Sequence, residues 1–141
     1  MEAGLKEIET LIENTKDKDL SKISELLKSF FKKYITRSHI DSYIGDYPTF
    51  IEPVYLEDNV KIGDDVLLGP NVYIGKDSVI NDYGEISNTI ILENATIGKN
   101  FKLNNCIIGK NSVFNFSNLN IKSCILQGKA NSEDELNKID L

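Results

Sequence analysis

The fold is decided by three similar hexads that follow one another: Ile62-Gly-Asp-Asp-Val-Leu67, Leu68-Gly-Pro-Asn-Val-Tyr73 and Ile74-Gly-Lys-Asp-Ser-Val79. Each hexad begins with a large aliphatic residue that glycine follows. In steps of six, the first position holds large aliphatic residues throughout, namely Leu56, Ile62, Leu68, Ile74, Ile80 and Ile86. Agreement over six successive steps indicates an internal repeat, so one structural unit is repeated along this part of the chain.

Beyond Ile86 the step shortens at regular places. The segments Ile86-Ser-Asn-Thr-Ile-Ile91, Leu103-Asn-Asn-Cys-Ile-Ile108 and Ile121-Lys-Ser-Cys-Ile-Leu126 are one unit repeated at intervals of 17 and then 18 residues. One five-residue step in each copy indicates a longer period of three hexads with one corner trimmed. The interval from Phe114 to Ile121 is seven residues, which predicts a bulge or small loop near 116–120.

These periods predict a mainly β fold, a parallel β-solenoid of about four triangular coils over residues 50–128. The first residue of each hexad should point inward, so Ile74, Ile91 and Ile108 should stack ~4.8 Å apart. Corner residues should take left-handed backbone conformations, which suit Gly, Asn and Asp. We expect this to explain the glycines at the corners, Gly63, Gly69, Gly75, Gly98 and Gly109. The chain has no Gly-x-Gly-x-x-Gly dinucleotide loop.

The segments on either side of the repeat lack the six-residue period. Residues 1–49 are expected to form a helical hairpin and a connector, with Asp17 or Asp19 as the N-cap of the second helix. The hairpin would cover the first coil or pack along one face, because an uncovered terminal coil exposes apolar side chains and strand edges. Residues 129–141 form a polar tail, for which we expect a short closing helix or no regular structure.

The repeat resembles the hexapeptide-repeat left-handed parallel β-helix family. Phe50-Ile-Glu-Pro-Val-Tyr-Leu56 and Asn105-Cys-Ile-Ile-Gly-Lys-Asn111 are similar to the C-terminal domain of sugar-1-phosphate nucleotidyltransferases. The left-handed winding is implied by this resemblance alone, since the general rule for parallel crossovers predicts the opposite hand. The catalytic domain of those enzymes, with its Gly-rich nucleotide loop, has no counterpart here. The resemblance therefore implies a module for oligomerisation or regulation. It does not imply nucleotidyl transfer, because that activity resides in the missing catalytic domain.

The single histidine and the two cysteines are the first candidates for chemistry. His39 precedes the coils, where a surface or capping role is favoured over that of an acyltransferase base. One histidine cannot supply the three zinc ligands of a hexapeptide carbonic anhydrase. Cys106 and Cys124 occupy equivalent places in adjacent coils, and stacked small residues are a simpler interpretation than a metal or redox pair.

The charged residues offer no clear site. The carboxylates of the repeat fit ordinary turn chemistry, and they comprise Glu52, Glu57, Asp58, Asp64, Asp65 and Asp77. Lys28, Lys32 and Lys33 are most simply a solvated helix face. The net charge of −6 argues against nucleic-acid binding, and no apolar run approaches the length of a membrane span. Two cysteines indicate no disulfide framework, so we expect a cytoplasmic protein.

These observations lead to one principal hypothesis and two alternatives. We expect a non-catalytic module with no catalytic, cofactor-binding or metal-binding residues, which forms a homo-oligomer, a trimer by the resemblance, or pairs with a separate nucleotidyltransferase catalytic chain. The first alternative is an acyl- or acetyltransferase with a site between protomers, using His39 across an interface. The second is a structural subunit of a larger complex.

Overall fold

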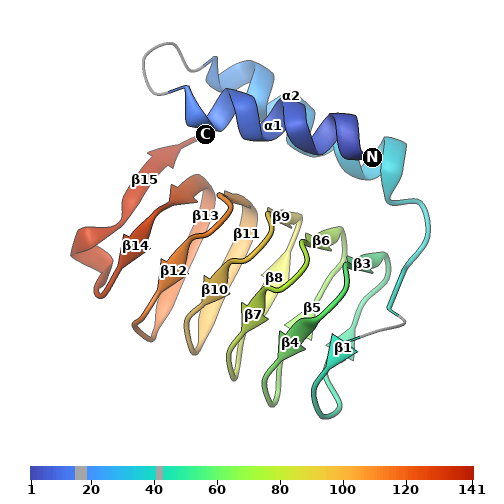
Figure 1. The fold of residues 1–141 in the computed structure, drawn as a ribbon, viewed down its shortest axis with the longest axis vertical. Coiled ribbons are helices and arrows are strands. Elements are labelled where there is room, and N and C mark those ends of the chain that lie inside the picture. Colours follow the sequence, from blue (N-terminus) through green and yellow to red (C-terminus); the bar gives the residue numbers. More distant parts are fainter. Residues whose placement is uncertain (15–18, 41–42) are drawn as a thin grey trace.

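The computed structural model describes residues 1–14, 19–40 and 43–141. It is a mainly β structure in which two helices, α1 (Glu2–Glu13) and α2 (Leu20–Tyr34), precede a parallel β-solenoid (Figure 1). The strands form three sides of the solenoid, which we name faces A, B and C. Face A consists of β2 (Thr49–Phe50), β5 (Leu67–Leu68), β8 (Glu85–Ser87) and the first halves of β11 (Phe101–Ile108) and β13 (Leu119–Gln127).

Face B carries β3 (Val54–Leu56), β6 (Val72–Ile74), β9 (Thr89–Ile91) and the second halves of β11 and β13. Face C consists of β1 (Tyr43–Ile44), β4 (Val60–Ile62), β7 (Val79–Ile80), β10 (Thr96–Ile97), β12 (Val113–Phe114) and β14 (Lys129–Ala130). The predicted parallel solenoid is thus confirmed. It has about five turns and not four, because β1, which lies in the expected connector, and β2, which begins at the end of that connector, form an additional winding that pairs with β4 and β5.

The interior is a continuous column of stacked side chains. Ile74 pairs with Ile91, Ile91 with the equivalent Ile108, and Ile108 with Leu126, and all four are fully buried. This is the stacking that the hexad spacing predicted. Burial of each such side chain contributes about 1.5–3 kcal/mol to folding.

Left-handed residues mark all three corners of the coils. Among the residues that the structure describes, thirteen other than glycine have positive φ, in the three columns Asn59, Asp77, Asn94, Asn111; Tyr47, Asp65, Tyr83, Asn100, Asn118; and Asn71, Asn88, Asn105, Ser123. The short polar side chains that dominate these columns tolerate this conformation best. The prediction of left-handed corners is confirmed, although asparagine serves them more than glycine does.

Most corner glycines have a different physical reason from the expected one. Among the five named above, only Gly69 has a positive φ, of 107°. Gly75 lies outside the left-handed region, but a Cβ atom there would lie 2.5 Å from the backbone nitrogen of Glu93 in the next coil. The glycine after the inward aliphatic residue therefore allows the backbones of successive coils to approach closely.

The trimmed corners join faces A and B without a break. The strands β11 and β13 bend at Asn105 (φ 59°) and Ser123 (φ 53°) and continue onto the next face. The predicted insertion is also present. Thr96 pairs with Val113 and Phe101 with Leu119, so the later coil has one extra residue between these positions.

The two helices lie along the solenoid axis and cover face B (Figure 1). The outward side chains of face B are apolar, and Tyr73, Ile90, Ile107 and Ile125 are buried against helix residues that include Ile8, Ile12, Ile23, Leu27 and Phe30. Gln127 Nε2 also donates to the carbonyl of Ile12 at 3.0 Å. Asp19 is the N-cap of α2, since its side chain accepts from Lys22 N at 3.1 Å, whereas Asp17 lies outside the described residues.

The polar tail contains more structure than expected. A 3₁₀ turn (Glu133–Glu135) leads to β15 (Asn137–Asp140), which pairs antiparallel with the second half of β13. Leu136 packs against the solenoid core. The short 3₁₀ helix agrees with one of the two expectations for the tail, whereas the strand that follows it was not expected. Pairing satisfies the outer edge of β13, which would otherwise present free backbone groups to solvent.

Candidate functional site

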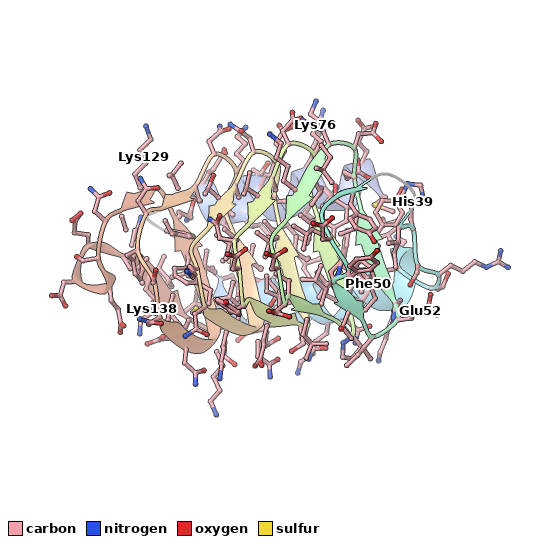
Figure 2. All side chains as sticks on the ribbon, turned by 90° about the horizontal axis from the view of Figure 1, so that it is seen from below. His39, Phe50, Glu52, Lys76, Lys129 and Lys138 are labelled. Atoms are coloured by element: carbon pink, nitrogen blue, oxygen red, sulfur yellow. The ribbon has the colours of Figure 1, made fainter. Side chains whose placement is uncertain are left out.

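The first coil forms an uncovered apolar end of the solenoid. Within the described part of the chain, three of the four exposed large hydrophobic residues lie there: Ile44 (56% exposed), Tyr47 (94%) and Ile51 (46%). Phe50, which is partly buried, lies at the same end as His39 and Glu52, while Lys129 and Lys138 lie toward the opposite end (Figure 2). The helices cover face B and leave this end open, so the apolar residues of the expected connector were a signal that the sequence analysis missed.

The backbone at this end also has an open edge. Thr49 N and Ile51 N donate to the carbonyls of Val66 and Leu68 in the next coil, at 2.9 and 2.8 Å. In a parallel ladder the alternate residue points its backbone groups the other way, so Phe50 N–H and C=O face outward. Apolar side chains and outward backbone groups together make this end competent to pair with another strand.

His39 begins face B at the same end. It forms a β-bridge with Tyr55, and its amide donates to the carbonyl of Val54 at 2.9 Å. Its ring stacks on Tyr55 with centroids 4.7 Å apart, and Tyr55 stacks on Tyr73 at 5.8 Å. Its position one rung before Tyr55 makes His39 the first member of an aromatic column.

Cys106 and Cys124 are neighbours inside the solenoid, as the repeat predicted. They are in register on β11 and β13, fully buried, with their sulfur atoms 3.6 Å apart. The hydrogen bond with Cys106, together with burial, raises the pKa of the Cys124 thiol. Because the thiolate is the reactive species, a raised pKa makes Cys124 a poor nucleophile. Residues 1–14, 19–40 and 43–141 contain no cluster of three or more side chains suited to hold a metal ion.

The carboxylates of the repeat are distributed over the corners. Asp65 and Asp77 take left-handed conformations, and Asp77 accepts from Asn59 Nδ2 at 2.9 Å. They act there as turn residues of successive coils. Lys28 and Lys32, by contrast, line a groove between α2 and the corner that joins faces A and B, opposite Asn71, Asn88 and Asn105. Sequence spacing placed both lysines on one side of a helix but gave no indication of the facing corner.

The family of the chain can be stated once this fold is described. A family model described as GMPPB C-terminal domain matches residues 50–137, which is more than half of the chain. The chain belongs to the GMPPB C-terminal domain family. No curated protein and no solved structure matches it significantly.

Membership of the GMPPB C-terminal domain family confirms the predicted relation to the tail domain of sugar nucleotidyltransferases. The matched residues include the coils from Phe50 onward and most of the tail, whereas α1, α2 and β1 lie outside the match. The helix layer is therefore an addition to the part that the GMPPB C-terminal domain family describes. None of the helices in the described residues is long and apolar enough to span a membrane.

Proposed function

We propose that this chain is a non-catalytic assembly module that self-associates through its first coil. The observation that carries the proposal is the concentration of Ile44, Tyr47 and Ile51, all exposed, at the one end of the solenoid that neither the helices nor the tail cover. Burial of apolar area contributes roughly 25 cal/mol per Å². An exposed apolar group beside an open strand edge is a common feature of interaction sites.

A second copy of the chain is the partner that this end fits. Two copies related by a two-fold axis present the same patch to each other, so the contact closes after two chains. With the axis through the corner at Tyr47, β1 of one copy would meet β2 of the other in antiparallel orientation. Their outward backbone groups would be satisfied and the apolar side chains of both copies buried in the same contact.

The trimer expected from the family resemblance would be built differently. Coils that pack side by side need an uncovered face, and the helices already cover face B. Face A presents Glu85 and Lys102, which form an ion pair at 3.9 Å. Because charged side chains are depleted from the centres of stable interfaces, this face supports a trimer less well than the first coil supports a dimer.

The mass of the protein in solution tests the proposal. We expect light scattering at tens of micromolar protein to give the mass of two chains, and the double variant Ile44→Ser/Tyr47→Asn to give the mass of one. Tyr83→Asn is the matched control, because Tyr83 is an exposed tyrosine at the same corner as Tyr47, with the same left-handed backbone. A wild-type monomer would overturn the proposal, and a trimer that the double variant leaves intact would favour packing along the faces.

A separate nucleotidyltransferase catalytic chain is the second candidate partner, which the family relation supports. A wild-type monomer that binds such a chain, with binding lost in Ile44→Ser/Tyr47→Asn, would establish this role in place of self-association. The acetyltransferase alternative needs His39 as a base between protomers, and thermal stabilisation by acetyl-CoA that disappears in His39→Ala would support it. We place the module in the cytoplasm, where the two buried thiols stay reduced.

A further inference from the structure

The groove between α2 and the corner joining faces A and B has the dimensions of a ligand site. Its volume is about 630 Å³, within the range of small-molecule pockets. Phe31 and Ile35 form an apolar side of this groove and are themselves nearly buried against the solenoid. The groove lies along face A's border with face B, away from the first-coil residues Ile44, Tyr47 and Ile51, so it is independent of the proposed assembly contact.

The charge of this groove is opposite to that of the protein. Lys28 and Lys32 line it one helical turn apart, and no acidic residue does, although the chain carries 22 acidic and 16 basic side chains. The cleft at the opposite border of face B, beside α1, is lined by four glutamates, which include Glu9, Glu57 and Glu93, and by the two lysines Lys6 and Lys76. The charged residues that line the two borders of the helix layer therefore sum to opposite signs, and the α2 border is the one whose net charge favours an anion.

Carboxamides form the wall that faces the lysines. Asn71 Nδ2 donates to Asn88 Oδ1 at 3.0 Å, and Asn88 Nδ2 donates to Asn104 Oδ1 at 3.1 Å. Asn105 Nδ2 donates to Ser123 Oγ at 3.1 Å. An asparagine amide has two N–H donors, so each of these groups retains a second donor beyond the bonds along the corner. The bonds between coils fix the three carboxamides, which reduces the ordering that a ligand would require.

We propose that this groove binds a small organic anion with an apolar ring or chain. The ammonium groups of Lys28 and Lys32 bind the phosphate or carboxylate, and the side chains of Phe31 and Ile35 contact the apolar part. The carboxamides of Asn71, Asn88 and Asn105 donate to polar atoms on the side of the ligand that faces the solenoid. Each of the three chemical surfaces is supplied by residues that line the same groove.

The probe that combines these properties is anilinonaphthalene sulfonate, a fluorescent anion with an apolar ring system. We expect it to bind the full chain and to bind the variant Lys28→Gln/Lys32→Gln about tenfold more weakly, because a hydrogen bond to a charged group has about that effect. Lys22→Gln/Lys33→Gln is the matched control, with the same change of charge on the same helix outside the groove. Equal affinities of the two double variants would overturn the proposal.

A second pair of variants tests the carboxamide wall. Asn88→Asp adds a negative charge in the groove, whereas Asn94→Asp adds it at an equivalent left-handed corner outside the groove. We expect about tenfold weaker binding in Asn88→Asp only, with circular dichroism showing that both variants fold. The uncharged analogue phenylnaphthylamine should bind at least about tenfold more weakly than the sulfonate. Equal binding of the charged and uncharged probes, or loss of binding in Ile44→Ser/Tyr47→Asn alone, would overturn the site.

Competition against the bound sulfonate then distinguishes the two anion classes. Phenyl phosphate and benzoate share an apolar ring and differ in the anion, so the stronger competitor identifies the group that the lysine pair prefers. Displacement by neither compound, at concentrations well above that of the probe, would overturn the proposal. Because this titration does not depend on the solution mass, its failure would leave the assembly proposal standing.

Discussion

Cys106 and Cys124 occupy directly neighbouring positions on two parallel coils, with their sulfur atoms 3.6 Å apart in the fully buried interior of the solenoid. Thr89 holds the corresponding place one coil earlier, and its hydroxyl accepts from Cys106 N at 3.3 Å. The three residues form one stack of small side chains on face B. Their contacts are those of a packed interior, and both thiols are buried from solvent.

Both thiols should be inert in the native protein. The hydrogen bond with Cys106 and burial raise the pKa of Cys124, whereas the same hydrogen bond lowers the pKa of Cys106. The protection of Cys106 therefore rests on its complete burial, which keeps the reagent from the sulfur atom. We expect an aromatic disulfide reagent at pH 8 to detect no thiol in the native state and two after unfolding in guanidinium. Rapid modification of either cysteine in the native protein would show that the interior is accessible.

Truncation of a side chain in the stacked core should lower the free energy of unfolding substantially. Ile91 is fully buried between Ile74 and Ile108, so Ile91→Ala leaves a cavity in the middle of the solenoid. We expect a loss of about 2–5 kcal/mol in the free energy of unfolding, measured by urea denaturation. Val79→Ala, at a half-buried position pointing outward on face C, should cost much less. Similar losses in the two variants would contradict the inward stacking.

The left-handed corners should discriminate between residue types. Asn94 has a φ of 57°, and its carboxamide donates to Asn111 Oδ1 at 2.9 Å. Asn94→Gly and Asn94→Val both lose this bond, but only valine is strained in the left-handed region. We therefore expect Asn94→Val to be less stable than Asn94→Gly by about 1–2 kcal/mol, as measured by chemical denaturation. Valine as stable as glycine at this position would argue against the corner conformation.

Close approach of the coils should make Gly75 intolerant of a side chain. A methyl group there would meet the backbone of Glu93, whereas at Gly109 it would meet the side chain of Gln127 at 2.9 Å. Backbone cannot move aside without shifting a whole coil, but the Gln127 side chain can change rotamer. Thermal denaturation should therefore show a larger decrease in melting temperature for Gly75→Ala than for Gly109→Ala. The reverse order would exclude close backbone approach as the reason for Gly75.

The solenoid could be predicted from the sequence because residues of one type recur at each turn of the coil. Inward aliphatic residues such as Ile74 recur at fixed steps, and the step of five at Leu103 reveals the triangular coil. The reason for Gly75 could not be predicted, since a corner glycine fits both a left-handed backbone and a close contact. Only the three-dimensional stacking of coils distinguishes the two.

The candidate sites were less accessible to sequence reasoning. Lys28 and Lys32 were recognised only as a charged helix side, because nothing in the order of residues pairs α2 with the corner of Asn88. A stronger signal existed for the helix layer itself. The outward position of face B holds Tyr55, Tyr73, Ile90, Ile107 and Ile125, whereas face A has Glu85 and Lys102 at the corresponding position. A column of outward apolar residues predicts the face that another element covers.

The helix layer changes how the solenoid should come apart. In a chain of stacked coils each unit contacts only its neighbours, so unwinding can start at an end and proceed one unit at a time. Here α1 and α2 contact face B from Tyr73 through Ile125, and Gln127 is bonded to Ile12 near the far end of α1. The helical hairpin therefore contacts several coils at once and holds them together. One coil cannot unfold without losing its contacts with helices that also pack against the other coils. The solenoid should therefore unfold in a single cooperative step.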